Sequence, residues 1–562
     1  MGLQEKEPVV AIFHQDTFPN EISYTPFDDL KLLKGEGQTL VNERSQTAAK
    51  SSDQSSLIGK QIKTVAVIGA GPAGLPTAKW LKEEGLSVTI FERNLAAGGT
   101  WIYDSTPPLN PKYPSEIPTE GAQPSLPPID QTLPYTQVKD LDDDTRRFLL
   151  EHAPPNPCYK SLGNNVATPL LKYKDLDWPE NTPWYTGHQA ICQYLQNYAS
   201  AFGLNEVTEF NTSVERVTEI PGDGGWHVLT KTTQKEIVNG RDVVNVTWNE
   251  KNFDAVVVAT GHYHVPYIPD FYGLSEWQAR WPQSVSHSKS YRVPEPFKGQ
   301  NVLVIGNGTS ALDIMRDIAS YTNDLYQAVR DSQHHFDEKY LQLRKELSSW
   351  VPAKVQGRKG IKKFTAKDSL NNSIIEFDDG QTLTGIDHII ICTGYMFNFH
   401  FLDHLHRDKA THRKFGQDVP TDDHVLVKGG DQVYNLHKDI FYIPNPTLSF
   451  VGIPFHIATF SFFEYQAFAV ARAYSKRAAL PDTVTMRQEW NSRLQKKGGG
   501  REFHALGAEL EQEYIQNILS WLNRDSTIYG GSIIKGHDSW WFDVKSNALA
   551  ELKKKMKTNA PE

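Results

Sequence analysis

The residues with the clearest chemistry are three glycines in a GxGxxG arrangement, Gly69, Gly71 and Gly74. The first glycine permits a tight turn, the second lets the backbone approach a diphosphate, and the third lets a helix pack on a strand. Free amides at the start of such a helix bind anions. The turn therefore predicts a dinucleotide diphosphate site made by Gly69, Ala70, Gly71, Pro72, Ala73 and Gly74.

A carboxylate follows this turn at the spacing expected for ribose recognition. Glu92 ends the run SVTIFE, 18 residues after Gly74, where a carboxylate can accept hydrogen bonds from a ribose diol. The same charge would repel a 2′-phosphate. The first site is therefore predicted to take FAD or NAD rather than NADP.

A second turn repeats the arrangement as GxGxxA, with Gly306, Gly308 and Ala311. Thr309 and Ser310 supply hydroxyl groups beside the predicted phosphate position. The run DLYQAVR ends in Arg330, where the first fold has Glu92. Because a guanidinium can bind a 2′-phosphate through two N–H groups, the second site is predicted to bind NADPH. An ordinary surface arginine is the alternative interpretation.

Buried parallel strands must position these turns. Four apolar, β-branched runs end in glycine: they begin at Thr64, Phe253, Asn301 and Ile386. Such runs are typical of buried strands, and those before Gly69 and Gly306 precede helical patterns. The sequence thus predicts an α/β protein with two Rossmann-like dinucleotide-binding domains. One site for a diol and one for a 2′-phosphate suggest electron transfer from a nicotinamide to a flavin.

Length and composition narrow the class further. The chain has 562 residues, and 58 Lys and Arg against 67 Asp and Glu give a net charge of −9, which offers no electrostatic footprint for nucleic acid. Three dispersed cysteines, Cys158, Cys192 and Cys392, provide neither a disulfide framework nor a cysteine-rich zinc site, so no metal is predicted. We expect a cytoplasmic protein without a transmembrane segment. Peripheral membrane contact of the KKKMK tail is an alternative without support.

Two stretches do not show a regular pattern. Residues 1–60 are expected to be an N-terminal extension, partly disordered because residues 38–60 contain few large apolar groups. Residues 104–157 contain 12 prolines, which should exclude regular sheet and most helix. This insertion either covers a site or is a passive surface loop. By contrast, the apolar stretch 440–474 is expected to be buried core.

Further motifs resemble those of a known family. Gly98, Gly99, Thr100 and Trp101 are similar to a GGxW element beside the flavin, and Tyr159 to Asn165 is similar to a YxxLxTN segment. The segment from Trp281 through His287 to Tyr291 resembles FxGxxxHxxxY, with Trp281 and Gln283 in place of phenylalanine and glycine. ATGH, with Thr260 and Gly261, CTGY from Cys392, PTLSFVG from Pro446 and EYQA, with Gln466, complete the series.

In order and spacing, these motifs resemble the flavin-containing monooxygenases, the class B flavoprotein monooxygenases, over roughly residues 64–523. The resemblance implies that the NADPH domain is inserted in a split FAD domain. The expected boundaries are 61–271 for the first FAD part, which includes the Pro-rich insertion, 272–384 for the NADPH domain, and 385–562 for the second FAD part. A last helix over residues 508–522 should pack on the FAD domain through Leu510, Tyr514, Ile518 and Trp521.

The resemblance also implies a reaction. NADPH reduces FAD, the reduced flavin binds the co-substrate O2 as a C4a-hydroperoxide, and one oxygen atom passes to a soft nitrogen or sulfur nucleophile of a small molecule. Asn165 is implied to be the catalytic residue that hydrogen-bonds the flavin, with Asn164 in place of the usual threonine. His287 and Tyr291 are implied to lie at the domain junction, with structural roles favoured. A homodimer is left open.

Three rival functions remain at this stage. A Baeyer-Villiger oxygenase acting on a ketone is left open by the altered FxGxxxHxxxY element, although Tyr291 favours the N- and S-oxygenating branch. An FAD-linked disulfide reductase would need a redox cysteine pair, and no suitable pair is apparent. A nucleotide-binding protein without turnover is the third alternative, and Asn165 together with both turns argues against it.

Overall fold

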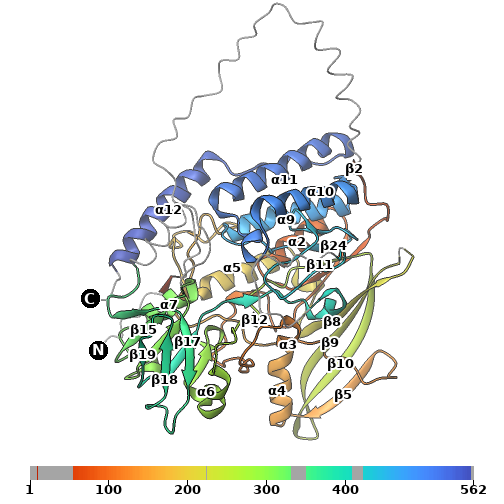
Figure 1. Ribbon diagram of the computed structural model, residues 1–562. Helices are drawn as coiled ribbons and strands as arrows, with labels where there is room; N and C mark the ends of the chain where they lie inside the picture. The colour runs from red at the N-terminus through yellow and green to blue at the C-terminus, as the bar shows by residue number, and fades with distance from the viewer. Residues whose placement is uncertain (1–8, 11–54, 223, 331–349, 408–421, 559–562) are drawn as a thin grey trace, which may run out of the picture.

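The computed structural model describes residues 9–10, 55–222, 224–330, 350–407 and 422–558, so most of the expected N-terminal extension lies outside the described residues. It is a mixed α/β protein in which the predicted strands form parallel sheets (Figure 1). Its longer helices are α2 (Gly74–Glu83), α4 (Asp143–His152), α5 (His188–Ala201), α6 (Leu274–Arg280), α7 (Thr309–Ile318), α9 (Thr459–Tyr474), α10 (Thr483–Lys497), α11 (Gly507–Tyr529) and α12 (Ser539–Thr558).

The first sheet has seven strands and contains the first glycine turn. Its order is β22 (Leu436–His437), β23 (Phe441–Tyr442), β24 (Leu448–Phe450), β11 (Ala255–Val258), β3 (Thr64–Ile68), β4 (Ser87–Phe91) and β7 (Thr208–Glu209). In the parallel register, Ile68 pairs with both Val258 and Phe91. The carboxyl ends of β3, β4 and β11 therefore meet at one edge, which brings Gly69, Glu92 and Ala259 together.

The second sheet has five parallel strands and contains the second turn. Its order is β13 (Val285–His287), β20 (His388–Ile391), β14 (Val302–Ile305), β15 (Leu325–Ala328) and β16 (Val355–Arg358). Ile305 pairs with both Ala328 and Ile391. The strand β20 of this sheet follows residue 384, where the second domain was expected to end, and that boundary stays a prediction. The other domain boundaries stay predictions.

The remaining short strands form small sheets of their own. Next to the second sheet lies an antiparallel set formed by β17 (Ile361–Thr365), β18 (Ile374–Phe377) and β19 (Thr382–Leu383). The two-stranded pairs are β12 (Val265–Pro266) with β21 (Tyr395–Met396), β1 (Val9–Val10) with β6 (Leu162–Gly163), and β2 (Ser55–Ser56) with β25 (Leu480–Pro481). The pair β12 and β21 joins the segment after ATGH to the CTGY segment.

The Pro-rich stretch is more regular than the sequence predicted. Within residues 104–157 the chain forms α3 (Pro118–Gly121), β5 (Tyr135–Asp140) and α4, and β5 is an edge strand of a four-stranded antiparallel sheet. Its partners are β10 (Arg241–Phe253), β9 (Gly225–Val238) and β8 (Thr212–Ile220). The prediction was wrong because residues 135–153 contain no proline, so the breakers lie on either side of these two elements.

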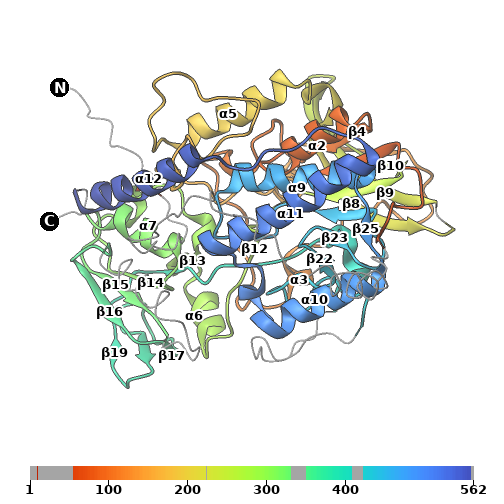
Figure 2. The ribbon, with the colours of Figure 1, turned by 90° about the horizontal axis from the view of Figure 1, so that it is seen from above.

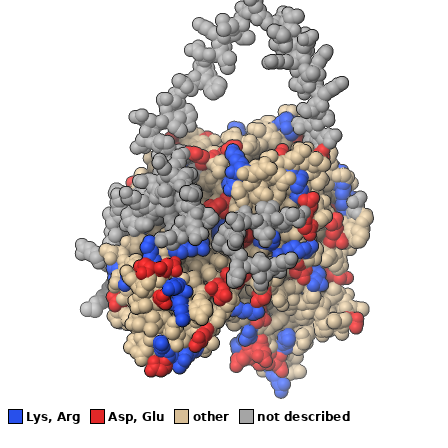
Figure 3. All heavy atoms as spheres, viewed as in Figure 1, with Lys and Arg blue, Asp and Glu red and all other residues tan. Residues whose placement is uncertain are grey.

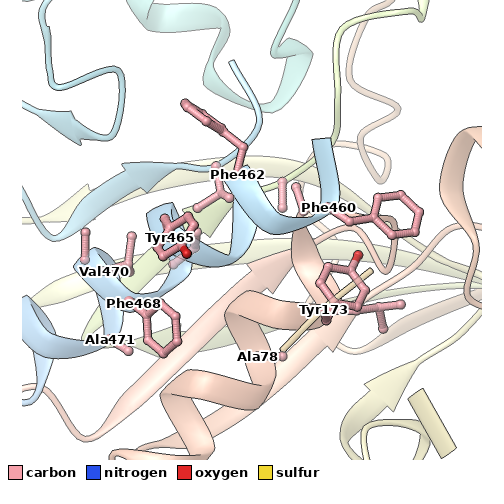
Figure 4. Close-up of a cluster of buried hydrophobic side chains, with 14 of the residues drawn as sticks. Ala78, Tyr173, Phe460, Phe462, Tyr465, Phe468, Val470 and Ala471 are labelled. Carbon is pink, nitrogen blue, oxygen red and sulfur yellow. The ribbon is translucent and has the colours of Figure 1, made fainter. Parts of the chain in front are cut away.

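The apolar stretch predicted to be core is buried, and α9 forms its C-terminal part. The Tyr173 ring stacks on the Phe460 ring of α9, with centroids 5.0 Å apart, and Ala78 of α2 lies close by (Figure 4). Seen from above, α9 lies between α2 and α11 (Figure 2). Ile515, Ile518, Leu519, Trp521 and Leu522 of α11 join the same core.

The prediction for the last helix was correct in its packing and wrong in two details. The helix α11 continues to Tyr529, and α12 follows it. Leu510 is exposed, because the buried face of α11 runs through Glu511, Ile515 and Ile518 instead.

Charged side chains of both signs are interspersed on the face shown in Figure 3, without a large area of one sign. Among the helices of the described part of the chain, none combines the length and the apolar character needed to cross a bilayer.

Candidate dinucleotide sites and the junction between them

The first turn has the close approaches that its glycines predict. A Cβ on Gly74 would lie 1.8 Å from the Gly69 carbonyl oxygen, and Gly69 itself has φ +104° with the Ala259 carbonyl close by. Side chains at these positions would separate α2 from β3. Since the first amides of a helix lack partners within the helix, the turn presents N–H groups at the edge where β3, β4 and β11 end.

Glu92 is buried at the end of β4 and binds the turn itself. One carboxylate oxygen accepts a hydrogen bond from the Ala70 amide at 2.8 Å. The other accepts bonds from the backbone and side-chain amides of Asn94 at 2.8 and 2.7 Å. The carboxylate is thus oriented beside the diphosphate turn, where the lone pairs that remain can accept from a ribose diol.

The GGxW element lies against the first turn. The Gly98 amide donates to the Ala70 carbonyl at 3.0 Å, and a Cβ on Gly99 would lie 2.8 Å from the Gly71 Cα. Thr100 follows in the short 3-10 helix Gly99–Trp101, in which the Trp101 side chain is buried. These contacts bring together two motifs that the sequence placed in the same site.

Asn164 and Asn165 have different surroundings although they are adjacent. The Asn164 side chain donates to the carbonyls of Val166 and Trp184 and accepts from the Thr186 amide. Asn165 is also buried, but its Nδ2 has no hydrogen-bond partner among the described residues. Asn164 is therefore occupied in holding the loop, which argues against the cofactor contact assigned to it, whereas Asn165 is free to donate to a bound group.

The second turn, like the first, follows a parallel strand that is paired with a neighbour on each side. It differs from the first turn in having open space beside its second glycine. Gly306 has φ +128°, and a Cβ there would lie 2.4 Å from the Cys392 carbonyl oxygen. A Cβ on Gly308 would meet no atom within 4 Å. Thr309 and Ser310 form the first residues of α7, and Ala311 is buried beneath them. The turn has room on its outer side for a phosphate.

Arg330 lies at the edge where the second-sheet strands end. It is exposed, two residues after β15, and the Val329 amide donates to the Arg358 carbonyl at 3.1 Å. The Arg358 guanidinium lies over the Tyr326 ring, 5.0 Å from its centroid. Two arginines, only one of which the sequence indicated, thus lie at this edge of the second sheet.

Three other predicted site residues make their contacts within the protein. His287 lies close to the Gly394 carbonyl through Nε2 at 3.1 Å and accepts from the Lys289 amide through Nδ1, and burial together with Lys289 lowers its pKa to about 3. Gln466 accepts from the Gly452 amide and donates to the Tyr514 hydroxyl. Tyr291 donates to Asp317. These contacts favour structural roles over cofactor binding.

Thr260 and Gly261, predicted to bind a cofactor, lie next to the first turn. They follow Ala259 at the end of β11, and the Thr260 Cα lies 3.6 Å from where a Gly69 Cβ would be. Both residues are exposed, and a Cβ on Gly261 would meet no atom within 4 Å. They are thus beside the first turn with space around them.

Two cations near the first site, the half-buried Arg93 and the buried Lys289, were not predicted. The two Nη atoms of Arg93 lie 2.9 and 3.1 Å from the ring nitrogens of His264, and Lys289 donates to the His264 carbonyl at 2.7 Å. Burial, with Arg93 and Arg292 nearby, lowers the pKa of Lys289 to about 7. Within the described residues, no carboxylate forms an ion pair with Arg93 or Lys289. No motif links these positions, so only the fold could reveal them.

Three features show whether the residues present fit a dinucleotide. They are the free donor of Asn165, the open space beside two of the glycines, and these two cations. Unpaired buried donors and uncompensated buried positive charge are costly in an isolated protein. An anionic diphosphate and a ring with hydrogen-bond acceptors would compensate both. The donor set therefore fits FAD at the first site and NADPH at the second.

The cysteines do not supply the chemistry of a disulfide reductase. All three are free thiols, and burial raises the pKa of Cys158 and of Cys392 to about 12 and also raises that of Cys192. Because the thiolate is the reactive form, these thiols are unreactive at neutral pH.

Comparison with known proteins agrees with this geometry. Residues 153–337 match the family described as flavin-binding monooxygenase-like, and residues 67–120 match an NAD(P)-binding Rossmann-like domain. Among solved structures, S-allyl-L-cysteine S-oxygenase from Allium sativum superposes with a TM-score of 0.61 at 26% identity, covering 89% of this chain and 95% of that chain.

Full-length relatives extend the similarity over nearly the whole chain. The flavin-containing monooxygenase ustF2 of Aspergillus flavus is 35% identical over 508 residues, which are 86% of this chain and 97% of that protein. The flavin-containing monooxygenase iboF of Amanita muscaria is 32% identical over 491 residues, 84% of this chain and 90% of that protein. The chain therefore belongs to the flavin-containing monooxygenase family.

Proposed function

We propose that this FAD- and NADPH-dependent monooxygenase transfers one oxygen atom from O2 to a nitrogen or sulfur nucleophile of a small organic molecule. The second oxygen atom leaves as water, with NADPH supplying the two electrons. The similarity to a protein named an S-oxygenase supports a sulfur nucleophile. Tyr291, at the position where ketone-oxidising relatives usually have tryptophan, supports the same branch.

The observation that carries this proposal is the free Nδ2 of Asn165. Its neighbour Asn164 uses its amide fully within the protein, so the loop is rigid at the point where Asn165 presents its donor. The main buried core includes Trp101, which precedes Asn165 in the sequence, and Val166, which follows it. An amide donor in surroundings without water interacts strongly with developing negative charge.

Each cofactor has a distinct set of holding residues in this proposal. The amides of residues 69–74 and the oriented Glu92 would hold FAD, and the start of α7 with Arg330 would hold NADPH. When bound, FAD accepts a hydride from NADPH and activates O2 for transfer of one oxygen atom. The chain itself binds, orients and shields, and the Asn165 amide donates a hydrogen bond at the flavin.

Substrate oxidation tests the proposal directly. Purified protein, which should be yellow, is mixed with NADPH and one of three substrates: a thioether, a tertiary amine or a cyclic ketone. The mass of each product is then measured by mass spectrometry. We expect faster NADPH consumption and a product heavier by one oxygen atom with the thioether or the amine. A product from the ketone alone would assign Baeyer-Villiger chemistry. A colourless protein inactive with added FAD would contradict the proposal.

An asparagine pair makes the role of Asn165 measurable. Asn165→Ala should lower the yield of oxygenated product per NADPH by about tenfold or more, because one donor aimed at the reacting group is lost. The control is Asn197→Ala, at an exposed position on α5, which should leave the yield unchanged. Equal yields for the two variants would remove Asn165 from the reaction.

A further inference from the structure

A cluster of hydroxyl groups and aspartates joins the two dinucleotide folds. Tyr159 donates to the Asp313 carboxylate at 2.7 Å, and Ser161 donates to Asp317 at 2.7 Å. Tyr291 donates to the same oxygen of Asp317. Tyr159 and Ser161 precede Asn165 in the chain, whereas both aspartates lie on α7. We call these five residues the tyrosine–aspartate cluster.

Tyr159, Tyr291 and Asp313 of the cluster are buried, whereas Ser161 and Asp317 are half-buried. Asp313 is fully buried, its Oδ1 has no partner among the described residues, and burial raises its pKa well above the usual range. Burial also raises the pKa of Tyr159 and of Tyr291, so both hydroxyls remain donors. A hydrogen bond from a phenol to a neutral carboxyl fixes the relative position of the two groups. Its burial costs little electrostatic free energy, because neither group is charged.

The aromatic rings reinforce this arrangement. Tyr159 and Tyr291 pack edge to face, with centroids 5.5 Å apart, and both belong to the apolar core beneath α7. Tyr291 follows β13 of the second sheet after one short 3-10 helix, and Tyr159 belongs to the segment that ends in Asn165. Two chain segments therefore meet at the helix α7.

The positions along the chain give the cluster its significance. Asn165 is fixed on one side by Asn164, which is bonded to residues 166, 184 and 186. On the other side, the chain is fixed to α7 through Tyr159 and Ser161. Asp313 lies about one turn after Thr309, where α7 leaves the second glycine turn. The placement of Asn165 relative to that turn thus depends on the cluster.

We propose that Asp313 and Asp317 are positioning residues for hydride transfer, because they hold the loop of Asn165 against the helix that starts the NADPH site. This inference rests on the proposed function. Neither aspartate needs to touch the cofactors or the substrate. Loss of a cluster bond should let the two folds shift relative to each other, and small misplacements of reacting groups slow a reaction strongly.

Anaerobic flavin reduction isolates this role. Holoenzyme is mixed with saturating NADPH under nitrogen, and the loss of flavin absorbance gives the reduction rate. Tyr159→Phe removes the hydroxyl and keeps the ring, and we expect a rate about tenfold lower, with FAD content unchanged. Asp313→Asn keeps a neutral acceptor for Tyr159, and should retain a rate within about threefold of the wild type, since a neutral hydrogen bond remains.

A second buried tyrosine provides the matched control. Tyr442 donates to the His424 carbonyl at 2.7 Å in the first sheet, away from α7. Tyr442→Phe should lower the melting temperature about as much as Tyr159→Phe and leave the reduction rate unchanged. Equal reduction rates for these two variants would overturn the proposal, because the Tyr159 bond would then be merely structural.

Two further results keep the test decisive. If Tyr159→Phe does not fold, Ser161→Ala, which removes only the bond to Asp317, should still slow reduction by about threefold or more, and an unchanged rate would overturn the proposal. If NADPH does not reduce the wild-type flavin, the proposed function fails before any variant is compared. The two failures are therefore distinguishable.

Discussion

At the scale of single residues, the site separates side chains whose hydrogen bonds are used within the protein from those that are not. Asn164, His287 and Gln466 have protein partners for their polar groups. Asn165 Nδ2 has none among the described residues. Ligand binding should therefore depend on the second group and loop rigidity on the first.

Arg330→Ala tests the choice of nicotinamide. We expect the KM for NADPH to rise by about 10- to 100-fold and that for NADH to change little, because a charge-assisted hydrogen bond to the 2′-phosphate is lost. Steady-state kinetics with both nucleotides measure the ratio. Arg146→Ala, at an exposed position on α4, is the control. Similar increases in KM for both nucleotides would separate Arg330 from the 2′-phosphate.

The sequence could predict residues that local spacing defines. Both glycine turns and Glu92 follow from such spacing, and the structure brings them to the expected strand ends. Asn164 could not be judged in this way, because its partners lie about 20 residues later in the chain. Arg93, His264 and Lys289 were missed for the same reason, since only the fold brings these three residues together.

At the scale of elements, α2 and α9 cover the first sheet and bury a carboxylate between them. Glu464 of α9 accepts from the Trp80 indole at 2.9 Å and from the Lys174 amide at 2.7 Å. Burial raises its pKa from 4.5 to about 7, although both hydrogen bonds oppose this shift. Helix packing is therefore linked to pH at this position.

Glu464→Gln should reduce the pH dependence of stability. Because the folded-state pKa is raised, the contribution of Glu464 to stability is full below about pH 4.5 and is lost as pH rises through about 7. The change amounts to roughly 3 kcal/mol. As pH rises between these values, the melting temperature of the variant should therefore increase relative to that of the wild type. Thermal scans across this range measure the difference.

The comparison for Glu464 uses an exposed carboxylate. Glu276→Gln, on the exposed face of α6, should follow the wild-type pH profile. A constant difference in melting temperature between Glu464→Gln and the wild type at every pH would mean that Glu464 does not titrate in this range.

Elements were predictable where the pattern was continuous. The four strands that end in glycine were found as expected, because apolar β-branched runs have few alternatives to a buried strand. The edge strand β5 and helix α4 were not, because flanking prolines hid a short regular segment whose partner β10 begins about 100 residues later. Sheet membership of β20 likewise depends on long-range pairing.

At the scale of the whole molecule, α12 connects the two folds on the side opposite the four-stranded sheet (Figures 1 and 2). Trp541 and Val544 belong to the main core, whereas Leu552 packs with Leu312 of α7 and Trp350. The Tyr185 hydroxyl donates to the Ala548 carbonyl at 2.6 Å. The helix α12 therefore packs on α7 through Leu552 and Leu312. The tyrosine–aspartate cluster contacts α7 through Asp313 and Asp317.

Leu552→Ala tests this connection. We expect a loss of roughly 2 to 5 kcal/mol in the free energy of unfolding if the two folds unfold together, because a buried leucine leaves a cavity. The KM for NADPH should rise as well, since α7 starts the second site. Denaturant unfolding and steady-state kinetics measure both effects. Glu551→Ala, at the exposed neighbouring position, should change neither quantity.

A result in which Leu552→Ala lowers stability and leaves the KM for NADPH unchanged would restrict α12 to a purely structural role. The sequence could not predict this bridge, because it showed a lysine-rich tail after residue 552 and gave no partner for the helix. The contact with Leu312 exists only because the second fold is placed beneath the end of α12.

Oxygen transfer from isotope-labelled O2 tests the central claim most directly. Purified holoenzyme is supplied with NADPH, labelled O2 and a thioether or amine, and the product is analysed by mass spectrometry together with NADPH consumption and hydrogen peroxide. The account predicts one labelled oxygen atom in each product molecule and about one product per NADPH. Consumption of NADPH that yields only hydrogen peroxide, or a product without label, would contradict it.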